Sequence, residues 1–447
     1  MSLKEIKINN ESEQRYDIFI DENGECCGSV LMPESEDNYT VLSVNNDNHL
    51  VLPPEVLKNL GIEPGVKLRF IEHENRIEIY PNIHSLSKLY IEPTSRCNLK
   101  CQTCVRNTWK EPMGDMDIKL FNRIVDQLED LDALRTVMLG GFGEPTFHKD
   151  ILYMIGRLKS LGLNVEMTSN GTLLNKDMMR GLIENGLDTL WVSFDGTSTE
   201  SFEDIREGAH FEAIVQSLTR LNVLNMESEH KVKIGIAFVV MKKNIHELKN
   251  LGQLACKVGA LKISISNVIP YSEDMLNQML CDRIIDRYNY RPYETSLPLI
   301  NLNQDTLGPL SELLMNNNNI SIMGYKMPIL KDSCKFIKER TTFIRWDGMV
   351  SPCMGLLHSY QTFFPSDGFE RWVTNYFLGD INKKRLKEIW DSQEYSSFRE
   401  KVDKFDFSPC FLCGHCNMSA ANEEDCYGNY LPACGGCLWS QGVIQCP

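Results

Sequence analysis

Short apolar runs alternate with segments of helical periodicity over residues 85–304 of the chain. Apolar side chains at every third or fourth position predict amphipathic helices, whereas short continuous runs of β-branched residues predict strands buried on both faces. Regular alternation of the two indicates βα units around a parallel sheet. The predicted strands are 89–92, 135–139, 163–168, 189–193, 233–240 and 261–267.

Helices are predicted between these strands, for example over 118–128, 150–161 and 176–184. Asp150 and Asn175 stand at the start of the second and third of these helices, and their short polar side chains are expected to cap the first turn. The middle of the chain is therefore expected to form an α/β domain of six βα units.

The flanking segments differ from this pattern. Residues 1–84 are predicted to form strands and turns, with a strand, a Pro-initiated helix and a Gly-stopped turn over 50–65 and strands at 67–71 and 76–80. This succession resembles the swapped-hairpin module of AbrB and MazE-type transcription factors. It holds few Arg or Lys residues, which favours a structural or substrate-docking use over DNA binding. Residues 311–447 are predicted to form a separate cysteine-rich domain.

Composition narrows the class of protein. The 447 residues carry a net charge of −15, which argues against a large nucleic-acid interface. The longest apolar run, 234–241, is too short to cross a bilayer, and the N-terminus lacks a signal peptide, so a cytoplasmic location is expected. Sixteen cysteines in that compartment indicate metal or cluster ligation rather than a disulfide framework. Four of them lack ligand spacing: Cys26, Cys27, Cys256 and Cys281.

Cys97, Cys101 and Cys104 follow the first predicted strand with the spacing Cys-x3-Cys-x2-Cys. Three thiolates on one short loop can hold three irons of a cubane cluster and leave the fourth iron open to a small molecule. A zinc site normally needs four ligands, and a disulfide needs an even number of cysteines.

This spacing resembles that of the radical S-adenosylmethionine (radical SAM) enzymes. The resemblance implies a partial (β/α)6 TIM barrel over 85–310 and a [4Fe–4S] cluster held by the three cysteines. It also implies S-adenosylmethionine (SAM) as cofactor, bound to the open iron through its methionine moiety. An electron from the cluster then breaks the sulfonium and gives a 5′-deoxyadenosyl radical, which abstracts hydrogen from a substrate.

Glycine-rich and polar segments follow the later predicted strands, where barrel enzymes gather their chemistry. Residues 140–145, Gly-Gly-Phe-Gly-Glu-Pro, resemble the GGEP element of that family, with Phe142 in place of its first glycine. Segments 168–172, 193–196 and 267–271 stand where the family contacts ribose and adenine, although each alone would also fit a polar turn. The expected residues of the SAM pocket are Gly141, Gly143, Glu144, Ser169, Asn170, Asp195 and Asn267.

Thr103 departs from the family pattern, in which the residue before the last cysteine of the loop is aromatic and packs near adenine. Trp109 and Phe142 are nearby aromatic residues that could fill the same space. Sequence alone leaves the choice between them open.

Nine further cysteines crowd the C-terminal domain. Thirteen residues separate Cys334 from Gly348, four more precede Cys353, and Trp346-Asp347-Gly348 predicts a hairpin turn between them. This opening resembles the SPASM domain, which implies two auxiliary [4Fe–4S] clusters. The later spacing departs from SPASM, one cysteine is left over, and zinc is an alternative for the Cys-x2-Cys pairs. The candidate ligands are Cys334, Cys353, Cys410, Cys413, Cys416, Cys426, Cys434, Cys437 and Cys446.

The tail 425–447, taken with the AbrB-like start, resembles the tungsten cofactor oxidoreductase radical SAM maturases over essentially the whole chain. The resemblance implies an enzyme that modifies a tungstopterin enzyme, its cofactor or an associated peptide, with ferredoxin or flavodoxin as electron donor. Three alternatives stay open: a SPASM-type enzyme that modifies peptide or protein side chains, a zinc-containing AbrB-like DNA-binding regulator, and an electron-transfer scaffold without chemistry of its own.

Overall fold

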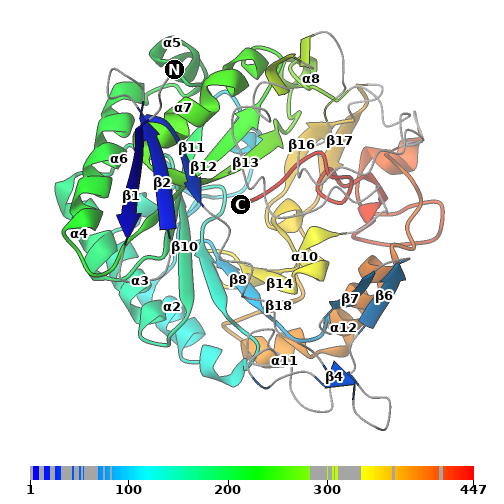
Figure 1. The fold of residues 1–447 in the computed structure, drawn as a ribbon. Coiled ribbons are helices and arrows are strands. Elements are labelled where there is room, and N and C mark those ends of the chain that lie inside the picture. Colours follow the sequence, from blue (N-terminus) through cyan, green and yellow to red (C-terminus); the bar gives the residue numbers. More distant parts are fainter. Residues whose placement is uncertain are drawn as a thin grey trace.

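The computed structural model describes residues 83–281, 334–364, 368–411 and 416–447, with 54, 300, 305, 306 and 308–310. For the first 82 residues it otherwise gives only the backbone of seven strands (Figure 1): β1 (Lys4–Asn9), β2 (Arg15–Ile20), β3 (Cys26–Leu31), β4 (Ser43–Val44), β5 (Leu50–Val51), β6 (Arg69–His73) and β7 (Arg76–Tyr80). The β6–β7 hairpin corresponds to the predicted strands at 67–71 and 76–80. The helix predicted between β5 and β6 lies outside the described residues apart from Pro54, so the AbrB-like character stays a prediction.

The centre of the fold is a sheet in the order β13-β12-β11-β10-β9-β8-β14-β15-β18. Its first six strands are parallel and run in sequence order from the middle to one edge. Their bounds agree with the predicted strands to within one residue: β8 (Lys88–Ile91), β9 (Thr136–Leu139), β10 (Asn164–Ser169), β11 (Thr189–Phe194), β12 (Lys233–Val240) and β13 (Ala260–Asn267). The predicted succession of βα units is therefore confirmed.

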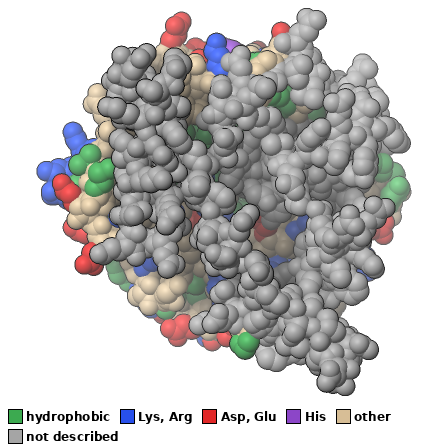
Figure 2. Space-filling view, viewed as in Figure 1, with side chains coloured by type: hydrophobic (Ala, Val, Ile, Leu, Met, Phe, Trp, Pro, Cys, Tyr) green, Lys and Arg blue, Asp and Glu red, His purple; other side chains and the backbone are tan. Residues whose placement is uncertain are grey.

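Helices cover the outer side of the curved sheet (Figure 1). They are α2 (Ile118–Val125), α3 (Ile151–Lys159), α4 (Lys176–Glu184), α5 (Thr199–Ile205), α6 (Phe211–Met226) and α7 (Leu248–Val258), followed by α8 (Glu273–Asn277). The apolar faces of α2 to α7 pack on the sheet in one hydrophobic core, as amphipathic helices should. In the space-filling view, acidic and basic side chains appear along the outer rim of these helices (Figure 2). Within the described residues, no helix is both long and apolar enough to span a bilayer.

One of the two predicted caps is wrong. Asn175 accepts a hydrogen bond from the Met178 amide at 2.9 Å, as expected for an N-cap. The Asp150 side chain makes no such bond, because its backbone does not take the extended conformation of a capping residue (φ −102°, ψ 15°). Its amide instead donates to His148 Nδ1 at 3.1 Å.

The C-terminal cysteine-rich segment continues the same sheet. Strand β14 (Thr341–Ile344) pairs in parallel with β8 and forms the predicted hairpin with β15 (Met349–Ser351), around Gly348 at φ 92°. The other elements of this segment are β16 (Tyr360–Phe363), β17 (Glu370–Val373), β18 (Gly379–Asp380), α10 (Lys335–Lys338), α11 (Leu386–Trp390) and α12 (Gln393–Lys404). The barrel and the cysteine-rich segment are thus joined by main-chain pairing, while the domain boundaries at 84 and 310 stay predictions.

Candidate active site

The three cysteines of the first loop lie directly after β8 and line one cavity of about 290 Å³. Residues from β8 to β13 contribute to its wall, so the cavity opens at the C-terminal ends of the parallel strands. Cys97, Cys101 and Cys104 are each partly buried, and none is in a disulfide. The structure therefore brings the predicted cluster ligands to the wall of one cavity in the barrel.

Amide and guanidinium groups donate to the sulfurs of this loop. Arg106 Nε lies 3.2 Å from Cys104 Sγ, and the Leu99 amide lies 3.4 Å from Cys97 Sγ. Asn170 Nδ2 approaches the same Cys97 sulfur at 3.6 Å. Such donors stabilise the negative charge of cluster thiolates and tune the potential of an iron–sulfur cluster. Three thiols on one short loop with these donors fit a cubane that keeps one iron free for a small molecule.

Burial raises the pKa of the Cys101 thiol to about 11. The thiol is consequently protonated at neutral pH in the absence of iron. Because a cysteine binds metal as thiolate, cluster assembly here must release protons.

The GGFGEP segment is packed tightly against the cysteine loop. A Cβ on Gly143 would lie 2.0 Å from the carbonyl oxygen of Thr94, and a Cβ on Gly141 would lie 2.6 Å from the Glu92 side chain. The Glu144 amide donates to the carbonyl oxygen of Arg96 at 2.8 Å. Glycine is required at 143 because only a residue without Cβ allows the two backbones to approach this closely.

Glu144 connects this segment to the loop after β10. Its buried carboxylate accepts hydrogen bonds from the Asn170 amide at 2.6 Å and from Ser169 Oγ at 2.9 Å. Burial raises the pKa of Glu144, while these hydrogen bonds oppose the shift. Glu144, Ser169 and Asn170 are thereby joined by hydrogen bonds at the cavity wall. The predicted pocket residues Gly141 and Gly143 line the same cavity.

The last two predicted pocket residues differ in position. Asn267 lines the cavity and donates to the carbonyl oxygen of Val443 at 3.1 Å. Asp195 does not line it; the side chain is fully buried and pairs with Arg206, whose Nε lies 2.9 Å from Asp195 Oδ2. Arg206 faces the cavity itself, so Asp195 acts on the pocket through this arginine.

Phe142, rather than Trp109, lines the cavity together with Thr103. Trp109 instead stacks on His358, with the ring centroids 4.0 Å apart, and meets the edge of Phe142 at 5.5 Å. Of the two aromatic candidates, only Phe142 therefore lines the cavity.

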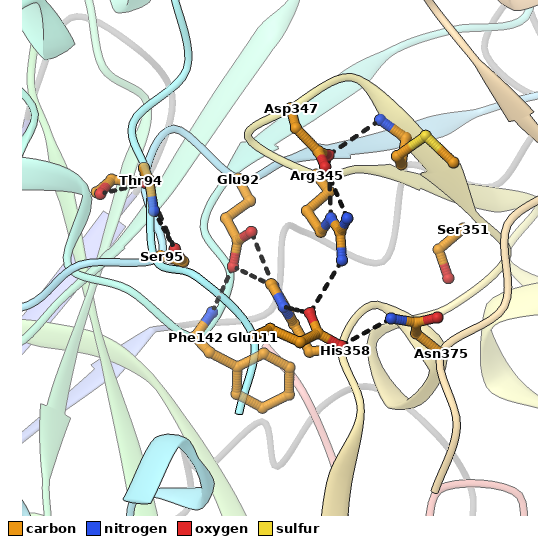
Figure 3. Close-up of polar contacts among 12 residues, drawn as sticks. Glu92, Thr94, Ser95, Glu111, Phe142, Arg345, Asp347, Ser351, His358 and Asn375 are labelled. Carbon is orange, nitrogen blue, oxygen red and sulfur yellow. Dashed lines mark hydrogen bonds and ion pairs between the residues drawn. The ribbon is translucent and has the colours of Figure 1, made fainter. Parts of the chain in front are cut away.

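Sequence reasoning missed a buried group of charges between the barrel and the cysteine-rich segment (Figure 3). His358 is 1% exposed; its Nε2 lies 3.0 Å from Glu92 Oε2, and its Nδ1 lies 3.1 Å from Glu111 Oε2. Glu92 Oε1 also accepts the amide of Phe142 at 3.2 Å, and Arg345 pairs with Glu111 at 3.0 Å. Glu92 directly follows β8, and the rule that chemistry follows barrel strands would have selected it.

Each nitrogen of His358 faces a carboxylate oxygen, and only the imidazolium carries a proton on both. Burial disfavours this charge, but Glu92 and the hydrogen bond to Glu111 raise the pKa of His358 above its usual value. Despite its own partial burial, the pKa of Glu111 is lowered to about 2 by the hydrogen bonds from His358 and Ser359. The group therefore ties the loop that carries Phe142 to the segment after Cys353 by paired charges.

A second set of thiols surrounds another cavity, in the cysteine-rich segment. Its four members are Cys334, Cys353, Cys434 and Cys437. Burial raises the pKa of Cys353 well above its usual value, and the other three thiols raise it further. Four thiols are the usual ligand set of an auxiliary [4Fe–4S] cluster. Among the described residues, no three Cys, His, Asp or Glu side chains converge as the ligands of a single metal ion do.

The other candidate ligands among the described residues do not line this cavity. Cys410 and Cys426 lie near each other, Cys416 lies between them in the sequence, and Cys413 lies outside the described residues. Cys446 does not line the auxiliary cavity: it lines the barrel cavity, and its Sγ accepts a hydrogen bond from Trp439 Nε1 at 3.3 Å. Cys256, on α7, is in a disulfide.

Comparisons with protein families agree with this geometry. Residues 91–255 match the radical SAM superfamily, and residues 334–417 match the SPASM iron–sulfur cluster-binding domain. The chain belongs to the radical SAM superfamily and carries a SPASM domain. It is therefore an enzyme that uses SAM and iron–sulfur clusters.

Among its relatives is the tungsten-containing aldehyde ferredoxin oxidoreductase cofactor-modifying protein of Pyrococcus furiosus, 31% identical over 80% of this chain and 96% of that protein. The Fe-coproporphyrin III synthase of Methanosarcina barkeri is 29% identical over 83% of this chain and 94% of that one. The structure of Streptococcus suis SuiB bound to S-adenosylmethionine has the same fold, with a TM-score of 0.51 and 18% identity over 74% of this chain and 71% of SuiB.

Proposed function

We propose that this enzyme cleaves SAM reductively and uses the 5′-deoxyadenosyl radical to modify a tungstopterin enzyme, its cofactor or an associated peptide. The observation that carries the proposal is the 31% identity to the tungsten cofactor-modifying protein, which extends over 96% of that relative. A match of that length includes both the barrel and the cysteine-rich segment.

Cys97, Cys101 and Cys104 would hold the catalytic cluster, and Arg106 and Asn170 would donate to its thiolates. When bound, the cluster supplies the electron that breaks the sulfonium of SAM. Glu144 fixes the loops after β9 and β10, so that their polar groups would face the methionine moiety of bound SAM. Phe142 and Asn267 complete the cavity on the side assigned to adenine.

Cys334, Cys353, Cys434 and Cys437 would hold one auxiliary cluster, because they surround a single buried cavity. Cys410, Cys413, Cys416 and Cys426 are the candidates for a second. Ferredoxin or flavodoxin would deliver the low-potential electron from outside.

Peptide modification is the second candidate function. It is favoured by 26% identity to the PqqA peptide cyclase of Granulibacter bethesdensis, which covers 42% of this chain and 49% of that enzyme. The match is shorter and weaker than the match to the tungsten cofactor-modifying protein, and for that reason the tungsten-linked function is preferred.

The test measures 5′-deoxyadenosine after anaerobic reconstitution with iron and sulfide and addition of SAM and dithionite. Wild type should form it, and Cys101→Ala should not, while the auxiliary iron of the variant is largely retained. Formation of 5′-deoxyadenosine by Cys101→Ala would contradict the assignment of the catalytic cluster. Stimulation by a tungstopterin enzyme rather than by short peptides would support the tungsten-linked substrate, and the reverse would favour peptide modification.

A further inference from the structure

Trp439 stands between the two cysteine-lined cavities. Its side chain contributes to the wall of the barrel cavity and to the wall of the cavity surrounded by Cys334, Cys353, Cys434 and Cys437. Its Nε1 donates to Cys446 Sγ at 3.3 Å, and Cys446 lines the barrel cavity. One indole side chain therefore connects the auxiliary-cluster site to a thiol in the active site.

The segment that carries Cys446 is held in place by several side chains. Tyr90 Oη on β8 donates to the carbonyl oxygen of Pro447 at 2.8 Å, and the Gln445 amide donates to Ser266 Oγ on β13 at 3.0 Å. Lys335 Nζ donates to the carbonyl oxygen of Cys446 itself at 2.8 Å. Because β8 and β13 are the first and last of the six parallel strands, the segment crosses the open side of the barrel.

Cys446 is also the one candidate ligand that the proposed function assigns to no cluster. The set around the auxiliary cavity already has four thiols, and Cys446 is not among them. Burial raises the pKa of the Cys446 thiol. The sulfur therefore keeps its hydrogen at neutral pH, and an S–H hydrogen is transferred to a carbon radical more readily than a C–H hydrogen.

We propose that Cys446 is a catalytic residue that donates a hydrogen atom to a carbon radical in the barrel cavity, and that Trp439 links it to the auxiliary-cluster site. In this step the S–H bond breaks, a C–H bond forms and a thiyl radical is left on Cys446. The thiyl radical would return to the thiol by taking one proton from water and one electron through Trp439, which the reduced auxiliary [4Fe–4S] cluster would supply when bound. Dithionite or a low-potential electron donor then reduces that cluster again. The inference rests on the proposed function, because it needs radical formation from SAM.

The test uses SAM cleavage in D2O without substrate, where the 5′-deoxyadenosyl radical itself takes the hydrogen. The Cys446 thiol exchanges with solvent, so wild type should give 5′-deoxyadenosine that carries one deuterium. In Cys446→Ala this deuterium should fall to the background that buffer and reductant supply. Cys281→Ala is the matched control, because Cys281 is buried but lines neither cavity, and it should behave as wild type. Equal deuterium in wild type and Cys446→Ala would overturn the inference.

Trp439→Phe keeps an aromatic ring but removes the Nε1–H donor and makes the ring harder to oxidise. The first turnover should still incorporate deuterium, whereas the number of further turnovers should drop because the thiyl radical is no longer reduced. Unchanged multiple turnover would remove Trp439 from the proposal.

Iron content and alkylation supply readouts that do not depend on turnover. Cys446→Ala should retain wild-type iron, whereas Cys437→Ala should lose it; an equal loss in both would make Cys446 a ligand and overturn the inference. SAM should protect Cys446 from iodoacetamide in wild type, because both occupy the barrel cavity, and absence of protection would contradict the placement. If wild type forms no 5′-deoxyadenosine at all, the proposed function fails, and these two measurements still decide the placement of Cys446.

Discussion

At the scale of single residues, His358 links the SAM pocket to the cysteine-rich segment. Replacement by Gln keeps its approximate size but leaves Glu92 and Glu111 without the positive charge between them. Removal of one partner from a buried ion pair costs about 3–5 kcal/mol. Because Glu92 also holds the Phe142 amide, we expect His358→Gln to raise the Kd for SAM as well as to lower the stability.

SAM binding can be followed by the change in the electron paramagnetic resonance spectrum of the reduced catalytic cluster. His246→Gln is the control, because its side chain is 62% exposed and pairs with the neighbouring Glu247. Weaker SAM binding in His358→Gln but not in the control is expected. An unchanged Kd with lowered stability would limit His358 to a structural role.

The same group of charges predicts a pH window. The raised pKa of His358 makes its contribution to stability complete below its unfolded pKa, near 6.5, and causes this contribution to be lost as the pH rises through the folded pKa. Burial alone would raise the pKa of Glu111, but the hydrogen bonds from His358 and Ser359 lower it to about 2. The contribution of Glu111 to stability is therefore complete above its pKa in the unfolded state and is lost as the pH falls through its pKa in the folded state. Denaturant titrations should show the largest stability difference between wild type and His358→Gln at mildly acidic pH. A difference that grows towards alkaline pH would contradict this.

The contacts within this group of charges could not be predicted from the sequence. Glu92 and His358 are separated by 266 positions, so no local spacing relates them. Glu144, Ser169 and Asn170 were predicted because each follows a strand of a parallel barrel, and the structure joins them by hydrogen bonds. The role of a residue that follows a barrel strand can be predicted from its position in the chain. The side chains of distant segments that it contacts cannot be predicted in this way.

At the scale of elements, the fit of the GGFGEP segment against the cysteine loop predicts the effect of Gly143→Ala. The new Cβ would meet the Thr94 carbonyl at 2.0 Å, which is backbone and cannot rotate away. We expect the variant to bind iron at Cys97, Cys101 and Cys104 as wild type does but to lose SAM-dependent 5′-deoxyadenosine formation. Gly308→Ala is the matched control, since its Cβ would meet no atom within 4 Å. Wild-type turnover by Gly143→Ala would show that the loop can shift without cost.

Strands were the most predictable elements, because buried runs such as Lys233–Val240 end abruptly at turns. Helix ends were less certain: α2 stops at Val125 and a short 3-10 turn follows, Leu128–Asp130, where periodicity alone predicted one helix to 128. The grouping of Cys334 and Cys353 with Cys434 and Cys437 depends on how distant segments pack. It cannot be predicted from the spacing of the cysteines in the sequence.

At the scale of the whole molecule, the barrel and the cysteine-rich segment share a core. Phe343 on β14 stacks on Tyr90 of β8 with ring centroids 4.3 Å apart, and both rings are at most 3% exposed. The Glu92 amide donates to the carbonyl oxygen of Ile344 at 2.9 Å, which extends the pairing to the residue that holds the SAM-pocket loop. Unfolding of one part should therefore expose the edge strand of the other.

This shared core predicts a single cooperative transition that Phe343→Ala shifts as a whole. Loss of a buried Phe costs about 3–5 kcal/mol, and the same substitution at Phe147, which is 46% exposed, should cost less than about 0.5 kcal/mol. Unfolding is followed by the fluorescence of the six tryptophans, Trp191 on β11 among them, and by the absorbance of the iron–sulfur clusters. If the two signals change together in wild type and move together in Phe343→Ala, the sheet that continues from β8 to β14 couples the SAM site to the auxiliary site. Two separate transitions, with only the absorbance affected by Phe343→Ala, would mean that the barrel holds its structure independently of the cysteine-rich segment.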